Sequence, residues 1–105
     1  MRVKDDSISL LGLSVQAYFA MNVADQVAKE HGQELVITSG SEAIKHSITS
    51  LHFSGDAFDM RTRFWSASEV KQVRDEIAAR LGRHFDVVIE GDHIHIEYQP
   101  KCMVS

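Results

Sequence analysis

Apolar residues recur at helical spacing in the first third of the chain. The repeating positions are Val15, Phe19, Val23 and Val27, with Ala20, Ala24 and Ala28 beside them. This spacing predicts an amphipathic helix from about Ser14 to His31, ended by Gly32, because a glycine after the last apolar turn is typical of a helix C-terminus. We expect the valine and phenylalanine stripe to face the core.

A second helical pattern begins at Ser66. Ser66-x-x-Glu69 has the form of a capping box, in which the serine hydroxyl accepts a hydrogen bond from the first turn. The apolar face that follows consists of Val70, Val73, Ile77 and Leu81. Because Gly82 comes directly after this face, the pattern predicts a helix between Ser66 and Gly82.

Shorter apolar runs predict four β-strands. They cover residues 34–38, 57–61, 85–89 and 93–98, and Glu90-Gly91-Asp92 joins the last two as a hairpin. The polar stretch from Ser39 to Gly55 has no sustained period and is interpreted as a long loop, a kind of segment that is often functional. The order of elements predicts an α+β fold, with helices packed on one face of a small, mainly antiparallel sheet.

Size and charge restrict the possible functions. A chain of 105 residues is long enough for one domain with a single core, and Pro100 marks the start of a tail. The net charge of −4 argues against a nucleic-acid partner, which normally meets a basic face. No apolar run approaches the ~20 residues of a membrane span, so we expect no membrane partner.

The N-terminus and the cysteine content bear on localisation. Residues 1–6 hold two cations with no apolar stretch behind them, which predicts synthesis in the cytoplasm without a secretory signal. The single cysteine, Cys102, cannot form an intramolecular disulfide, and this fits a reducing compartment.

Histidines and carboxylates gather in two segments. In the last strand, alternation places His93, His95 and Glu97 on one face and isoleucines on the other, although two solvent-facing histidines on an edge strand would give the same pattern. Upstream, His52 and Asp59 flank a small-residue turn that lets both reach one ion; alternatively, Asp59 pairs locally and His52 is an ordinary loop residue. Together the segments can supply three N or O ligands, the number that a catalytic zinc site uses when its fourth position holds water.

The same residues carry a resemblance to a known family. The two motifs are Ser50-x-His52-x-x-Gly55-x-Ala57-x-Asp59 and His93-x-His95. They resemble the zinc D-Ala-D-Ala carboxypeptidases and the L-alanyl-D-glutamate endolysin peptidases, in a superfamily that includes lysostaphin-type enzymes and the hedgehog signalling domain. The resemblance runs from about Thr38 to Tyr98. It implies a hedgehog/DD-peptidase-like fold and a single zinc peptidase-like domain over residues 1–105.

The resemblance also implies roles for individual residues. The ligands of one zinc ion would be His52, Asp59 and His95. His93 would be an auxiliary group that orients the bound water or the substrate. The catalytic acid of the family lies a few residues before the last ligand, where Glu90 and Asp92 both qualify and Glu90 is slightly favoured.

The function implied is hydrolysis of a peptide bond in peptidoglycan stem peptides, by a carboxypeptidase or an endopeptidase. Small phage and prophage endolysins of this kind have no signal and reach the cell wall after a holin opens the membrane. Two alternatives remain open from the sequence, a non-catalytic zinc-binding module of the same fold and a metal-free structural domain of a phage particle.

The chain departs from the family at one position. Many relatives have an arginine after the Ser-Gly turn that holds the substrate or its oxyanion, whereas residues 41–46 contain none. Lys45 and His46 are the candidate replacements, and without one of them the substrate preference would differ.

Overall fold

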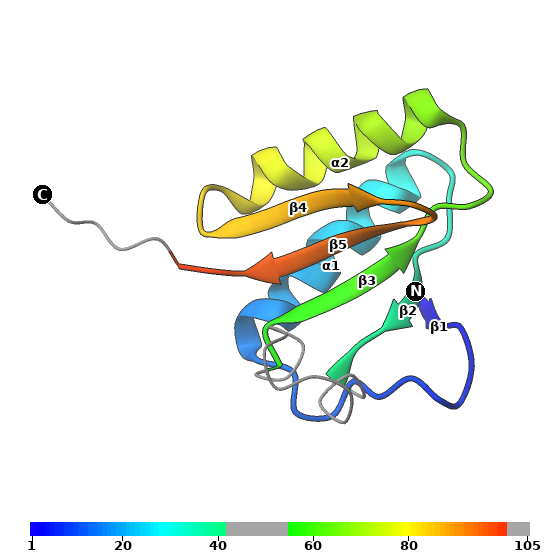
Figure 1. Ribbon diagram of the computed structural model, residues 1–105. Helices are drawn as coiled ribbons and strands as arrows, with labels where there is room; N and C mark the ends of the chain where they lie inside the picture. Colours follow the sequence, from blue (N-terminus) through cyan, green and yellow to red (C-terminus); the bar gives the residue numbers. More distant parts are fainter. Residues whose placement is uncertain (42–54, 101–105) are drawn as a thin grey trace, which may run out of the picture.

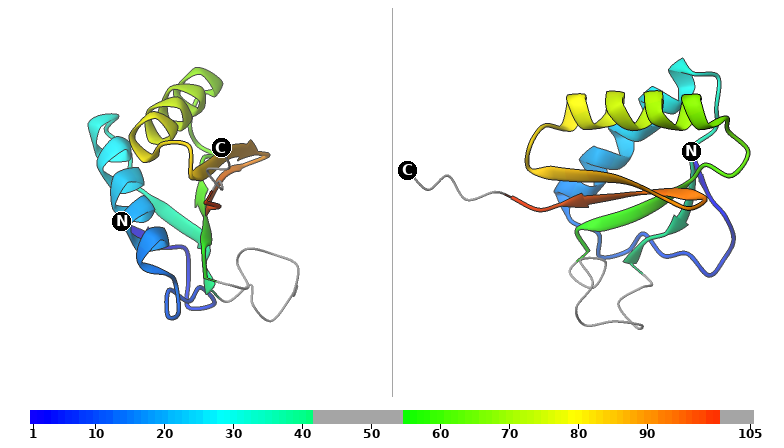
Figure 2. Two further views of the ribbon diagram at one scale, coloured as in Figure 1. Left: turned by 90° about the vertical axis from the view of Figure 1, so that its left-hand side faces the viewer. Right: turned by 45° about the horizontal axis from the view of Figure 1, so that its top comes forward.

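In the computed structural model, which describes residues 1–41 and 55–100, five strands form one sheet and two helices cover one of its faces (Figure 1). The elements are β1 (Arg2–Val3), α1 (Val15–Glu30), β2 (Val36–Ser39), β3 (Ala57–Arg61), α2 (Ala67–Leu81), β4 (Phe85–Glu90) and β5 (His93–Tyr98). Figure 2 shows both helices on the same side of the sheet. The predicted α+β class and the placement of the helices on one face are thus confirmed.

The sheet has the order β1-β2-β3-β5-β4 and is mixed. The pairs β2–β3, β3–β5 and β5–β4 are antiparallel, as predicted, but β1 pairs with β2 in parallel. The sequence did not predict β1, because a strand of two residues is too short to show alternation. The β4–β5 turn is also tighter than predicted, since Glu90 pairs with His93 and leaves only Gly91 and Asp92 between the strands.

Serine side chains begin both helices. The Ser14 hydroxyl accepts a hydrogen bond from the backbone N–H of Ala17 at 3.1 Å, and the Ser66 hydroxyl accepts one from Glu69 at 3.2 Å. These bonds satisfy N–H groups that have no partner within the first turn. The N-cap predicted at Ser66 is therefore confirmed.

The predicted core stripe of α1 is wrong at its N-terminal end. Val15 is 79% exposed and Phe19 is 52% exposed. The residues of α1 that are buried are Ala17, Ala20, Met21, Ala24, Val27 and Ala28. In a helix of 3.6 residues per turn, a stripe of every fourth residue rotates by about 40° at each step and so drifts away from the buried side. The residues that are buried alternate steps of three and four, and this spacing keeps them on one side of the helix. Its small alanines allow α1 to lie close to α2 and to the sheet.

The two faces of the sheet differ in chemistry. Side chains that point toward the helices form the core, and they include Phe58, Met60, Ile94 and Ile96. The opposite, open face carries the polar residues of the same strands, which are Asp59, Arg61, His93, His95 and Glu97. The predicted alternation of β5 is thus confirmed. Neither helix in the described part of the chain is both long and apolar enough to cross a membrane.

Candidate functional site

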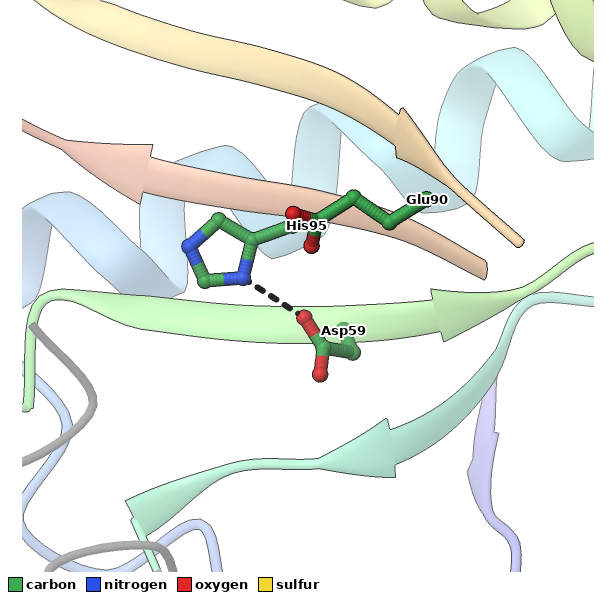
Figure 3. Close-up of side chains that lie close together, drawn as sticks. All are labelled: Asp59, Glu90 and His95. Atoms are coloured by element: carbon green, nitrogen blue, oxygen red, sulfur yellow. Dashed lines mark hydrogen bonds and ion pairs between the residues drawn. The ribbon is translucent and has the colours of Figure 1, made fainter. Parts of the chain in front are cut away.

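Asp59 and His95 form the centre of the polar face. They are directly opposite one another on the neighbouring strands β3 and β5. Asp59 Oδ1 lies 2.7 Å from His95 Nδ1, and both side chains are less than one-fifth exposed (Figure 3). The cross-strand register therefore brings together two residues that are 36 positions apart in the sequence.

Glu90 adds a carboxylate from the adjacent strand. It ends β4, and its side chain extends toward His95 in Figure 3. One donor atom from each of Asp59, Glu90 and His95 can be chosen so that all three atoms lie within 4.8 Å of one another. The structure thus brings a candidate ligand pair and a candidate catalytic acid to the same place.

His93 connects the second candidate acid to this cluster. Its Nε2 lies 3.4 Å from Glu90 Oε1 and 3.9 Å from Asp59 Oδ2. Its Nδ1 lies 3.3 Å from Oδ1 of Asp92, which is 71% exposed. His93 therefore has one ring nitrogen toward the cluster and the other toward the hairpin turn. That position suits the auxiliary role implied by the resemblance.

The short contacts change the proton affinities of these groups. The hydrogen bond to Asp59 raises the pKa of His95 above its usual value, and this effect outweighs the opposing effect of burial. The hydrogen bond with His93 lowers the pKa of Asp92. In the metal-free protein, Asp59 therefore favours a protonated His95.

Asp59 and His95, the two described members of the predicted ligand set, offer donor atoms that zinc accepts. Imidazole nitrogens and carboxylate oxygens are its usual ligands, at about 2.0–2.2 Å. Tetrahedral ligands at that distance are about 3.4 Å apart, and Asp59 Oδ1 and His95 Nδ1 are 2.7 Å apart, so small side-chain rotations would let both reach one ion with the Glu90 carboxylate nearby. The first predicted ligand, His52, lies outside the described residues, as do Lys45 and His46.

Gly55, which belongs to the first motif, has a structural reason to be glycine. Its φ of +79° lies in the left-handed region, and a Cβ there would collide with the backbone carbonyl oxygen of Gly12. The Gly55 carbonyl accepts a hydrogen bond of 2.8 Å from the Ser14 N–H. This close approach ties the chain just before β3, and hence Asp59, to the N-terminus of α1.

The structure also reveals cations near the cluster that the sequence interpretation missed. Arg61 lies on the open face two residues after Asp59, and its β5 partner is His93. Together with Lys4, Thr38, Arg63 and Asp92 it lines a pocket of about 290 Å³. The same alternation that grouped His93 with His95 would have placed Arg61 beside Asp59, whereas nothing in the sequence indicates that Lys4 is near.

In comparisons with known proteins, no family model, curated protein or solved structure matches this chain. The family resemblance therefore rests on the two motifs and enters below as a proposal.

Proposed function

We propose that this protein is a zinc peptidase with a hedgehog/DD-peptidase-like fold that hydrolyses a peptide bond in peptidoglycan stem peptides. The observation that carries the proposal is the contact of Asp59 with His95 across two strands. The two motifs are remote in sequence, and the sheet register brings them together on the face that the helices leave open. The nearby carboxylate of Glu90 adds the acid that such a reaction needs.

His52, Asp59 and His95 would hold the ion, as the resemblance implies. When bound at such a site, zinc lowers the pKa of a coordinated water toward ~7 and polarises a carbonyl oxygen. The site would have a net charge near +1, because Asp59 is its only anionic ligand. Such a charge favours the developing oxyanion of peptide hydrolysis.

A carboxylate near the cluster would carry the proton. Glu90 is the better placed of the two acids, since its oxygen belongs to the group of donor atoms around Asp59 and His95. It would accept a proton from the attacking water and pass it to the leaving amine. Asp92 contacts His93 instead and would act on the cluster through that ring.

Zinc quantification combined with a turbidity assay on purified cell walls tests the proposal. We expect about one zinc ion per chain and a loss of turbidity, with both abolished in His52→Ala. Mass spectrometry of the released fragments would identify the bond cut. A chain purified without chelator at neutral pH that holds no zinc would overturn the proposal.

The two alternatives predict different results. A non-catalytic zinc module would bind the ion through the same residues but leave cell walls intact. A metal-free structural domain would show an unchanged unfolding midpoint in His52→Ala, because no ligand would be lost.

A further inference from the structure

A basic pocket lies beside the candidate metal cluster. Lys4, Thr38, Arg61, Arg63 and Asp92 line it, and its volume is about 290 Å³. Four different parts of the chain meet here, namely the residue after β1, strand β2, the end of β3 with the residues that follow it, and the β4–β5 turn. The pocket is thus built by the fold rather than by one local run of charged residues.

The cations of the pocket are available to a ligand. The ion pairs of the described residues are made by other cations, and none involves Lys4, Arg61 or Arg63. The two guanidinium groups instead lie over the ring of Phe64, at 5.5 Å and 4.7 Å from its centroid. Stacking on an aromatic ring orients a guanidinium. Its N–H donors point outward in the plane of the guanidinium itself and stay free to bind an anion.

The pocket is also close to the cluster. Asp59 and Arg61 are two residues apart on one face of β3, which separates their Cα atoms by about 6.7 Å. Thr38, a pocket residue, donates a weak hydrogen bond of 3.5 Å to the backbone carbonyl of Asp59. A ligand that reaches from the cluster into the pocket therefore needs to span only one or two residues.

We infer that this pocket binds a free carboxylate on the substrate residue that follows the cleaved bond. This inference rests on the proposed function and extends it to the substrate. The guanidinium fork matches a carboxylate with two parallel hydrogen bonds. Asp92 also lines the pocket, so its three cations and one carboxylate give it a net charge near +2, which attracts an anion.

Two kinds of stem-peptide substrate carry such a carboxylate. In a carboxypeptidase substrate it is the C-terminal carboxylate of the residue that is released. In an endopeptidase substrate it is the α-carboxylate of a D-glutamate that continues the chain through its γ-carboxyl group. The pocket would bind the same group in both cases, so the experiment must separate them.

Small model compounds distinguish the two possible sources of the carboxylate in binding assays on the purified full chain. N-acetyl-D-alanine represents the first source and N-acetyl-D-glutamine the second, each compared with its α-amide by NMR shift titration. We expect each carboxylate to bind at least about tenfold more tightly than its amide, because the amide loses the ion pair with arginine. The more tightly bound of the two acids would identify the source. Equal binding of acids and amides, or tighter binding of inorganic phosphate than of either acid, would overturn the inference.

Variants assign the effect to the pocket. Arg61→Gln and Arg63→Gln should each weaken carboxylate binding at least about fivefold, and Arg61→Lys should retain part of it. Arg80→Gln is the matched control, since Arg80 pairs with Glu30 between the helices. Unchanged thermal midpoints would show that the variants are folded. Unchanged binding in both Arg61→Gln and Arg63→Gln would refute the inference.

The two proposals fail in different ways. If the chain bound no zinc but still bound carboxylates through Arg61, the proposed zinc peptidase would be refuted and the assignment of the carboxylate pocket would stand. If zinc bound and cell walls were cut, while Arg61→Gln left the KM of a carboxylate substrate unchanged, only the pocket assignment would fall.

Discussion

Asp59 and His95 face one another across β3 and β5, with Oδ1 and Nδ1 2.7 Å apart. Their strands carry core residues on the opposite face, since Phe58 and Ile94 are fully buried beneath the helices. The polar pair is thus fixed by the same register that builds the core.

Loss of a ligand should weaken zinc binding. Asp59→Asn and His95→Ala should each lower the zinc affinity at least about 100-fold, more than the 10–100-fold typical of losing a partner of a ligand. Competition with a chromogenic chelator measures the affinity. His84→Gln is the control, because His84 lies between α2 and β4, outside the cluster. Equal affinity in the wild type and in both ligand variants would contradict the assignment.

Removal of zinc should lower the unfolding midpoint. At 100 times its dissociation constant, a ligand stabilises the folded state by about 2.7 kcal/mol. In a domain of this size, that energy corresponds to roughly 10–20 °C in midpoint. Differential scanning calorimetry with and without chelator measures the shift. In His95→Ala, chelator should have little effect.

The pKa of His95 should make the stability of the metal-free protein depend on pH. Asp59 raises this pKa in the folded state. The contribution is therefore fully present below the unfolded-state pKa of about 6.5 and is lost as the pH rises through the higher folded-state value. NMR titration of the metal-free chain should give a His95 midpoint above 6.5, and Asp59→Asn should lower it. A wild-type midpoint below 6.5 would show that burial dominates.

Strands β3 and β5 could be predicted from the sequence to the residue, because alternation is a strong signal when one face is buried and the other polar. The two residues of β1 carry no such signal. The sequence pattern places Glu90 in the turn, and only its pairing with His93 assigns it to β4. The sequence also could not indicate how close Glu90 comes to Asp59, since that depends on the neighbouring strand.

The candidate site, too, was only partly predictable from the sequence. The residue types of the two segments suggested one shared site, but the choice of Asp59 and His95 as ligands came from the family resemblance, and the first segment alone leaves local pairing of Asp59 open. The basic pocket was not predicted at all. Lys4 and Arg63 reach it from segments whose positions depend on tertiary packing, and no local pattern records that.

Replacing the hairpin acids should distinguish their roles. Glu90→Gln should lower kcat for cell-wall hydrolysis by about 100- to 10,000-fold, the usual contribution of a general base, while zinc stays bound. Asp92→Asn should have a smaller effect, because Asp92 contacts His93 rather than the cluster. Steady-state kinetics with parallel metal analysis tests this. A larger loss in Asp92→Asn than in Glu90→Gln would exchange the assignments, and full activity in both would favour the non-catalytic module.

Gly55→Ala should destabilise the fold more than an ordinary glycine substitution. Gly32→Ala is the matched control, since Gly32 also has a positive φ, of +71°, but open space around the missing Cβ. The control should cost about 1–2 kcal/mol from left-handed strain alone. At Gly55 the collision with the Gly12 carbonyl adds to that strain. Urea denaturation measures both, and equal costs would show that the Gly12 segment can move away.

Two substitutions in α1 test which of its faces is buried. Met21 is 1% exposed in the core, and Met21→Ala should lower the free energy of unfolding by about 2–5 kcal/mol through loss of packing and the cavity left behind. Val15 is 79% exposed, although the every-fourth-residue pattern predicted it to be buried, and Val15→Ser should change stability by no more than about 0.5 kcal/mol. Urea denaturation of both variants gives the comparison. A large loss in Val15→Ser together with a small one in Met21→Ala would mean that α1 packs with the other face inward, because only burial makes the removal of an apolar side chain costly.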